Sequence, residues 1–129
     1  MNTRPSILVI DDSALIRRTV EIGLGEAHGW DVRTADSGAE GLAMASHEKP
    51  DAILLDVEMP DLDGPGTLNR LQAHGAAQEI PVLFLTGYST EEHHRRLTAL
   101  GAAGVITKPF DPSTLATQIT QLLGWTPGS

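Results

Sequence analysis

Five short apolar runs, each followed by a segment with helical spacing, are the feature that most limits how this 129-residue chain can fold. The runs lie at residues 6–10, 31–35, 52–55, 81–85 and 105–107. Strands that are apolar along most of their length, and that alternate with helices, form a parallel sheet with both faces covered. We therefore expect an α/β fold in which five βα units build a doubly wound, five-stranded parallel sheet.

Helix signals stand between these runs. Residues 37–40 (SGAE) and 89–92 (STEE) have the form of capping boxes, Pro65 suits a first helical turn, and Asp111 and Pro112 begin the last helix. The spacing predicts that one face of each helix turns inward. The residues assigned to these faces are Leu15, Ile16, Val20 and Leu24; Leu42, Ala43 and Ser46; Leu68 and Leu71; Leu97 and Leu100; and Leu115, Ile119, Leu122 and Leu123.

Composition narrows the functional classes. The length and the 40% hydrophobic content predict one domain over residues 1–129, with a core at about 6–123 and a tail or linker start at 124–129. There is no cysteine for a disulfide or a thiolate zinc site, and no apolar run has membrane-spanning length, so we expect a cytoplasmic protein without membrane contact. The net charge of −8 argues against direct binding to nucleic acid, because attraction to phosphates needs clustered cations.

Polar residues follow four of the five expected strands. Asp11 and Asp12 come after the first strand and Asp56 after the third, while Thr86 follows the fourth and Lys108 lies just past the fifth. In an open parallel sheet the carboxyl ends of the strands share one edge, and sites lie beyond that edge. We therefore expect these five side chains to converge.

Such a group of side chains suits phosphoryl chemistry. Carboxylates that repel one another attract a hard divalent cation, and Mg2+ prefers oxygen ligands, including those of phosphates. A carboxylate held beside Mg2+ can attack a phosphoryl donor as a nucleophile. The Lys108 ammonium and the Thr86 hydroxyl would then stabilise the charge on the transferred group.

Taken in order, the stretches SILVIDD, LLDVEMPDLDG, LFLTG and KPF resemble the receiver domain of two-component response regulators over essentially the whole chain. The resemblance implies a flavodoxin-like sheet with strand order 2-1-3-4-5. It implies a signalling phosphoacceptor and not an enzyme, with self-catalysed phosphoryl transfer and autodephosphorylation as its only reactions. A histidine kinase or a phosphotransfer protein would donate the phosphoryl group, and an unknown downstream protein would respond to it.

The resemblance also implies roles for the acidic residues. Asp56 would accept the phosphoryl group. Asp12, Asp56 and the backbone carbonyl of Val57 would hold Mg2+, with Asp11 assisting mostly through water. The signalling surface would consist of the fourth helix, the fifth strand and the fifth helix, and a weak dimer would form through the same surface.

Two residues of the resemblance would respond to phosphorylation. Thr86 would move to bind the phosphoryl group and Lys108 would pair with it, while the bond between Lys108 and Pro109 would be cis. The family often has Tyr or Phe where this chain has Val105, so this position offers no aromatic ring for coupling to the threonine. We therefore expect activation to act mainly through the loop after Thr86 and the helix that begins near Thr90.

Other side chains near the expected site suggest further functions. By the resemblance, Glu58 and Tyr88 occupy positions at which receiver domains set how fast water removes the phosphoryl group. A carboxylate with a bulky phenol there predicts a long-lived phosphoprotein. Residues 93–96 (HHRR) could form a metal or phosphate patch. Adjacent histidines on a helix point about 100° apart, however, so a solvated helix face is favoured there, with partner contact as its alternative function.

Three other classes of protein share parts of this pattern. A phosphatase of the haloacid dehalogenase type also uses an aspartyl nucleophile, but it needs an Asp where this chain has Glu58, and its acidic metal ligands come late in the chain. A flavodoxin-like cofactor binder would need a hydroxyl- and glycine-rich loop after the first strand, where Asp11 and Asp12 would repel a phosphate. A binding module that works without phosphorylation is the third alternative, although all the expected acceptor residues are present.

Overall fold

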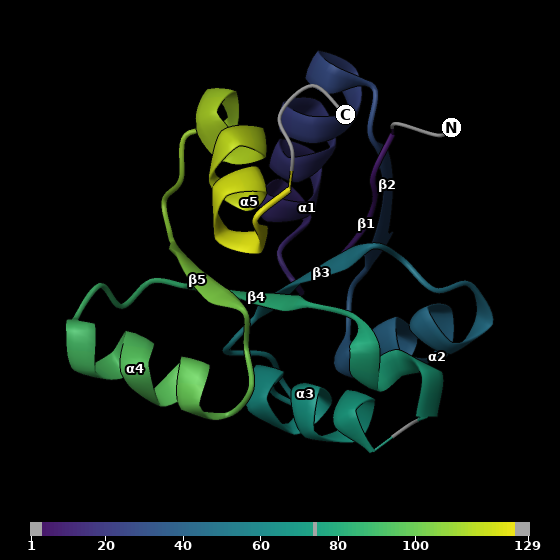
Figure 1. The fold of residues 1–129 in the computed structure, drawn as a ribbon, viewed down its shortest axis with the longest axis vertical. Helices are drawn as coiled ribbons and strands as arrows, with labels where there is room; N and C mark the ends of the chain where they lie inside the picture. The colour runs from purple at the N-terminus through teal and green to yellow at the C-terminus, as the bar shows by residue number, and fades with distance from the viewer. Residues whose placement is uncertain (1–3, 74, 126–129) are drawn as a thin grey trace.

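A computed structural model describes residues 4–73 and 75–125 and contains a five-stranded parallel sheet. The strands are β1 (Ser6–Ile10), β2 (Asp31–Ala35), β3 (Ala52–Asp56), β4 (Val82–Thr86) and β5 (Gly104–Thr107). Their order in the sheet is β2-β1-β3-β4-β5 (Figure 1). The expected fold class and strand order are therefore confirmed, with strand bounds that differ from the sequence prediction by one residue at most.

Helices cover both faces of the sheet. They are α1 (Ala14–Val20), continued by the π-helix η1 (Glu21–Glu26), α2 (Gly38–His47), α3 (Gly64–Gln72), the 3-10 helix η2 (Gly75–Glu79), α4 (Glu91–Ala99), the 3-10 turn η3 (Pro112–Thr114) and α5 (Leu115–Leu123). Helices α1 and α5 lie on one face, and α2, α3 and α4 lie on the other (Figure 1). The sheet is thus the middle of three layers.

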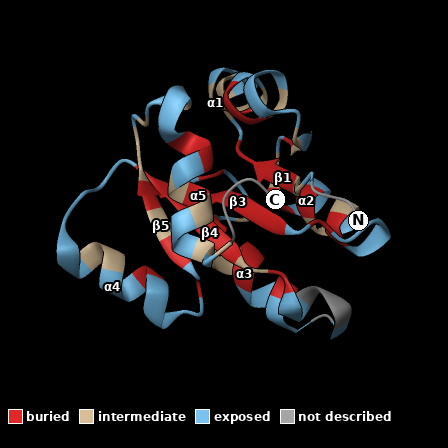
Figure 2. Cartoon of the chain, turned by 45° about the horizontal axis from the view of Figure 1, so that its top comes forward, coloured by how far each residue is buried: buried red, intermediate tan, exposed pale blue. Residues whose placement is uncertain are grey.

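Side chains alternate along each central strand between the two helical layers, because successive residues of a strand point to opposite faces. In β1, Ile7 and Val9 pack under α1 and α5, whereas Leu8 and Ile10 pack under α2, α3 and α4. Every residue of β3 and β4 is buried, the terminal Asp56 and Thr86 included. Figure 2 shows the buried residues concentrated along these strands. The buried strands β3 and β4 therefore fix the positions of Asp56 and Thr86 at their carboxyl ends.

The helix caps confirm one predicted capping box and place the N-cap of the other helix one residue later than predicted. The Ser37 hydroxyl accepts a hydrogen bond from the Glu40 N–H, as the SGAE stretch predicts, and the Glu40 carboxylate in turn accepts one from the Asp36 N–H. In the STEE stretch the cap is Thr90, whose hydroxyl accepts from the His93 N–H. The second prediction was therefore wrong by one residue, because Ser and Thr both suit an N-cap and stand side by side.

Several predicted helix faces were wrong in part. In α2 the buried residues are Gly38, Gly41 and Ala45, whereas Ala43 and Ser46 are exposed. The reason is close packing, since a Cβ built on Gly41 would collide with the Ile10 side chain of β1. The other residues predicted to turn inward that are exposed are Leu15, Leu100 and Leu122.

Candidate functional site

The carboxyl edge of the sheet gathers the predicted polar residues. Asp56 and Thr86 are the last residues of β3 and β4, which are neighbours in the sheet, and Asp11 directly follows β1 on the other side of β3. Oxygen atoms of Asp11, Asp12 and Asp56 lie within 4.8 Å of one another. Asp11 and Asp56 are buried, whereas Asp12 is exposed. The edge is therefore an acidic cluster that opens to solvent at Asp12.

Lys108 joins two of these carboxylates. Its Nζ donates a hydrogen bond of 2.9 Å to Asp56 Oδ1 and forms an ion pair of 3.0 Å with Asp11 Oδ2. The backbone holds the lysine next to the cluster, since its N–H donates to the Thr86 carbonyl at 2.7 Å. The peptide bond between Lys108 and Pro109 is cis. The Lys108 ammonium thus bridges the two buried carboxylates of the cluster.

Asp11 is fixed by the start of α1. Its Oδ1 accepts a hydrogen bond from the Ser13 N–H at 2.9 Å, and its backbone carbonyl accepts one from Arg17 at 2.8 Å. The partner of its fully buried Oδ2 is the Lys108 ammonium, 3.0 Å away, and among the described residues no backbone N–H donates to that oxygen. A buried carboxylate oxygen with a single partner keeps a lone pair for a cation.

The electrostatics of the cluster raise the pKa of Asp56. Burial of the carboxyl group is the largest cause, the Lys108 hydrogen bond opposes it, and the negative charges of Asp11 and Asp12 add to it. Burial lowers the pKa of Lys108, but hydrogen bonds and attraction from Asp56 and Asp11 outweigh that effect and leave the pKa raised. The lysine therefore stays charged, and the Asp56 carboxylate remains short of positive partners.

The loop after β3 is held by backbone contacts. The Val57 carbonyl accepts a hydrogen bond from the Gly64 N–H at 2.9 Å, which leaves its second lone pair for another partner. Asp63 caps α3 by accepting from the Gly66 N–H at 2.8 Å. A Cβ on Gly64 would collide with the Asp56 carbonyl oxygen and lie 2.8 Å from Val57 Cα. A residue without a side chain is therefore needed where the loop meets α3.

The Thr86 hydroxyl is bound on the side of α4. Its Oγ1 accepts a hydrogen bond from the Tyr88 N–H and lies 3.1 Å from His93 Nε2. Among the described residues, no hydrogen bond joins this hydroxyl to the side chain of Asp56 or Lys108. The prediction of a solvated face for residues 93–96 is therefore wrong at His93 and His94, which are both half-buried, whereas Arg95 and Arg96 are exposed as predicted. The sequence signal that could have found this contact is the interval of seven residues from Thr86 to His93. The loop between β4 and α4 is short, so the first turn of α4 stays close to the end of β4.

The remaining predicted residues surround this edge. Glu58 is exposed, and Tyr88 is 56% exposed with its ring centroid 5.1 Å from that of His93. Val105 is half-buried and packs with the apolar residues under α2, α3 and α4. Neither Glu58 nor Tyr88 therefore has a side chain sequestered in the core, and both lie in the loops that border the cluster.

The donor set fits a hard divalent cation. The available ligands are carboxylate oxygens and the Val57 carbonyl, which are the oxygen ligands that Mg2+ prefers. The Asp11 oxygen whose one partner among the described residues is Lys108, together with the exposure of Asp12, favours a cation that keeps several waters. Asp11, Asp12, Asp56 and Val57 are thus the residues that could hold it.

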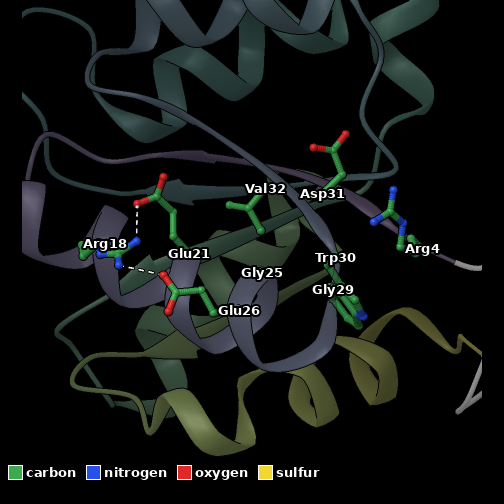
Figure 3. A pocket seen from close by; sticks show the side chains of 9 residues that line it. All are labelled: Arg4, Arg18, Glu21, Gly25, Glu26, Gly29, Trp30, Asp31 and Val32. Carbon is green, nitrogen blue, oxygen red and sulfur yellow. Dashed lines mark ion pairs between the residues drawn. The ribbon is translucent and has the colours of Figure 1, made fainter.

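A hollow of about 430 Å3 lies at the opposite edge of the sheet from the acidic cluster, near the amino ends of β1 and β2 (Figure 3). Its lining includes Arg18, which forms ion pairs with Glu21 at 3.5 Å and Glu26 at 2.7 Å. Figure 3 shows both pairs on one side of the hollow, with Trp30 and Asp31 on the other. This hollow is separate from the acidic cluster, and Arg18 is already paired with two carboxylates.

Comparison with known proteins identifies the family that the sequence resembles, and a solved structure shares the fold described above. The response regulator receiver domain family matches residues 7–120. Chemotaxis response regulator CheY4 of Vibrio cholerae superposes with a TM-score of 0.86 at 34% identity, covering 93% of this chain and 99% of that one. The part of this chain that the structure describes contains no helix long and apolar enough to cross a membrane.

Longer regulatory proteins also match. The probable transcriptional regulator ycf27 of Porphyridium aerugineum is 38% identical over 120 residues, which are 93% of this chain and 48% of that protein. The DNA-binding dual master transcriptional regulator RpaA of a Synechocystis species is 37% identical over 119 residues, which are 92% of this chain and 49% of that protein. The chain therefore spans about half the length of these curated relatives.

Proposed function

Because the chain belongs to the response regulator receiver domain family, the phosphoacceptors of two-component signalling, we propose that its acceptor is Asp56. One observation carries this assignment: the Lys108 ammonium bonds Asp56 Oδ1 at 2.9 Å beside an acidic cluster that opens to solvent at Asp12. The raised pKa of Asp56 supports it, since a buried carboxylate short of positive partners is a better nucleophile than a fully solvated one.

The residues suggest how the transfer proceeds. An oxygen of Asp56 attacks the phosphorus of a phosphohistidine, the new O–P bond forms as the P–N bond breaks, and the imidazole leaves. Lys108 moves from the Asp56 carboxylate to the oxygens of the transferred group, whose charge it stabilises. Thr86 turns to bond one of these oxygens. Mg2+, held by Asp12, Asp56 and the Val57 carbonyl with Asp11 behind them, would neutralise the charge on the transferred group.

The partners follow from the proposed chemistry. Receiver domains interact with kinases and phosphotransfer proteins, and we propose that a histidine kinase or a phosphotransfer protein in the cytoplasm donates the phosphoryl group. The surface that responds would be α4, β5 and α5, where a downstream protein or a second copy of the chain would bind. The matched region is about half of each of these curated relatives, so the activity and partners of the whole protein are also proposals.

The test is the intact mass of the protein after incubation with acetyl phosphate and Mg2+. Acetyl phosphate supplies the phosphoryl group and releases acetate, so one added phosphoryl mass is expected on the wild-type chain. The adduct should be absent from Asp56→Asn and should require the metal. Asp61→Asn is the matched control, because Asp61 is an exposed carboxylate of the same loop and its loss changes the net charge equally.

Each outcome separates two classes of function. An adduct on the wild type and on Asp61→Asn, but not on Asp56→Asn, supports the proposal. An adduct that survives Asp56→Asn would move the acceptor elsewhere. If no adduct forms, beryllofluoride binding distinguishes rapid turnover, in which the mimic binds, from a receiver fold that works as a binding module without phosphorylation.

A further inference from the structure

The contact between Thr86 and His93 links the candidate site to the first turn of α4. His93 Nε2 lies 3.1 Å from Thr86 Oγ1, and the His93 N–H donates to the Thr90 hydroxyl that caps the helix. The ring of His93 also packs against that of Tyr88, with centroids 5.1 Å apart. The side chain is therefore held from two sides, and its Nε2 is directed at the end of β4.

The hydrogen-bonding capacity of the Thr86 hydroxyl is limited. A hydroxyl has one proton to donate and two lone pairs that accept. One lone pair accepts from the Tyr88 N–H at 3.1 Å, and His93 takes either the proton or the second lone pair, depending on which tautomer is present. Both partners belong to the loop after β4 or to α4. A phosphoryl oxygen on Asp56 can only accept the hydroxyl proton, and both present partners lie on the side of α4, so the hydroxyl must turn away from them to donate to it.

We propose that His93 is a positioning residue that holds Thr86 turned toward α4, so that a phosphoryl group on Asp56 competes with His93 for the Thr86 side chain. The inference rests on the proposed function, and it adds a regulatory residue to that site. His93 does not touch the reacting atoms; it acts only through Thr86.

This competition couples the site to the proposed signalling surface. When Thr86 turns toward Asp56, the bond between β4 and the first turn of α4 is lost. The side-chain contacts that still hold that turn are then those of His94, whose Nε2 bonds the Tyr88 carbonyl at 2.8 Å and lies 3.4 Å from Thr107 Oγ1. Because coupling between two sites is reciprocal, a partner that pulls His93 away would favour phosphorylation equally. Val105 offers no ring to swing, so this contact supplies a route from Thr86 to α4 that needs none.

Beryllofluoride, a stable mimic of the phosphoryl group, measures the competition directly. Its affinity in the presence of Mg2+ is compared among the wild type, His93→Leu and His93→Gln. Removing one hydrogen bond of ordinary net strength should tighten binding to His93→Leu about 2- to 10-fold. His93→Gln should remain near the wild type, because its amide can still bond the Thr86 hydroxyl. His47→Leu is the matched control, since it makes the same replacement at an exposed histidine of α2.

A second background tests whether the effect passes through Thr86. In Thr86→Val the hydroxyl is absent, so His93→Leu should change the affinity less than 2-fold there. Affinity of His93→Leu that equals or falls below the wild type, or an equal gain in the Thr86→Val background, would overturn the inference. Failure of the wild type to bind beryllofluoride at all would instead contradict the proposed function of Asp56.

A measurement on the wild type keeps the inference testable if His93→Leu does not fold. The imidazole NMR signals of His93 are followed as beryllofluoride and Mg2+ are added, with His47 as the internal reference. Loss of the Thr86 bond should shift the His93 ring signals while those of His47 stay in place. An unchanged His93 ring in the fully bound protein would overturn the inference.

Discussion

Replacement of Asp56 by Asn should stabilise the metal-free protein. The carboxylate oxygens of Asp11, Asp12 and Asp56 lie within 4.8 Å of one another. At an effective dielectric constant near 20 each pair of charges at that separation repels by about 3–4 kcal/mol, so Asp11 and Asp12 together repel Asp56 by about 7 kcal/mol. The Lys108 ammonium 2.9 Å from Asp56 attracts by about 6 kcal/mol on the same scale. These terms nearly cancel, so the cost of burying the carboxylate decides the sign. Asn keeps an acceptor for Lys108 without that cost, and we expect a gain of about 1–2 kcal/mol.

The pH dependence follows from the raised pKa of Asp56. A carboxyl group whose pKa is higher in the folded state stabilises the fold when protonated, and this contribution is complete below the ordinary carboxyl pKa. It is lost as pH rises through the raised value. The free energy of unfolding of the variant should therefore match that of the wild type below the ordinary carboxyl pKa and exceed it increasingly as pH rises through the raised pKa of Asp56, above which the difference is constant.

Urea unfolding at several pH values, with and without Mg2+, measures the difference. A cation bound only by the folded state adds about 1.4 kcal/mol at ten times its dissociation constant. The wild type should gain this stability in Mg2+, while the variant, with one ligand fewer, should gain less. Asp36→Asn, at an exposed carboxylate, is the control for the change in net charge. A metal-free variant less stable than the wild type, or a difference that responds neither to pH nor to Mg2+, would refute the reasoning.

Two further predictions concern the loops around the cluster. Gly64→Ala should lower both stability, by about 1–3 kcal/mol, and the yield of the Asp56 adduct, because its Cβ would displace the backbone that carries the acceptor; thermal unfolding and intact mass measure this, and an unchanged adduct yield would contradict it. The phosphorylated protein should be long-lived, and Glu58→Ala or Tyr88→Ala should shorten its lifetime by opening the path of the attacking water. Decay of the adduct mass with time measures the lifetime, and decay within seconds that neither variant alters would show that these side chains do not control it.

The sequence alone determined the sheet and the residues at its edge. Five apolar runs that alternate with helical segments predict a parallel sheet with both faces covered. The strand order that makes β1, β3 and β4 neighbours was implied by the resemblance to receiver domains, and the structure confirms it. Asp56 and Thr86 stand at the ends of apolar runs in this pattern, and the carboxyl ends of parallel strands lie at one edge of the sheet, so the sequence places both residues at that edge.

The inward face of α2 depended on tertiary packing. Periodicity favoured the bulkier Leu42 with Ala43, but the helix approaches β1 so closely that Gly41 and Ala45 face the sheet. Hydrophobicity indicates which residues gain from burial, whereas the distance between two elements decides which side chains have room. That distance is a property of the whole fold.

The partner of Thr86 was likewise decided by the tertiary structure. The sequence has two adjacent histidines, and only the position of the cap at Thr90 and the rotation of α4 set which ring meets β4. A shift of the cap by one residue would turn the helix by about 100° and present a different side chain. Local patterns thus determined which residues stand at the site, whereas the packing of α4 on the sheet determined which of them hold one another, because a hydrogen bond depends on ångström distances that residue order does not encode.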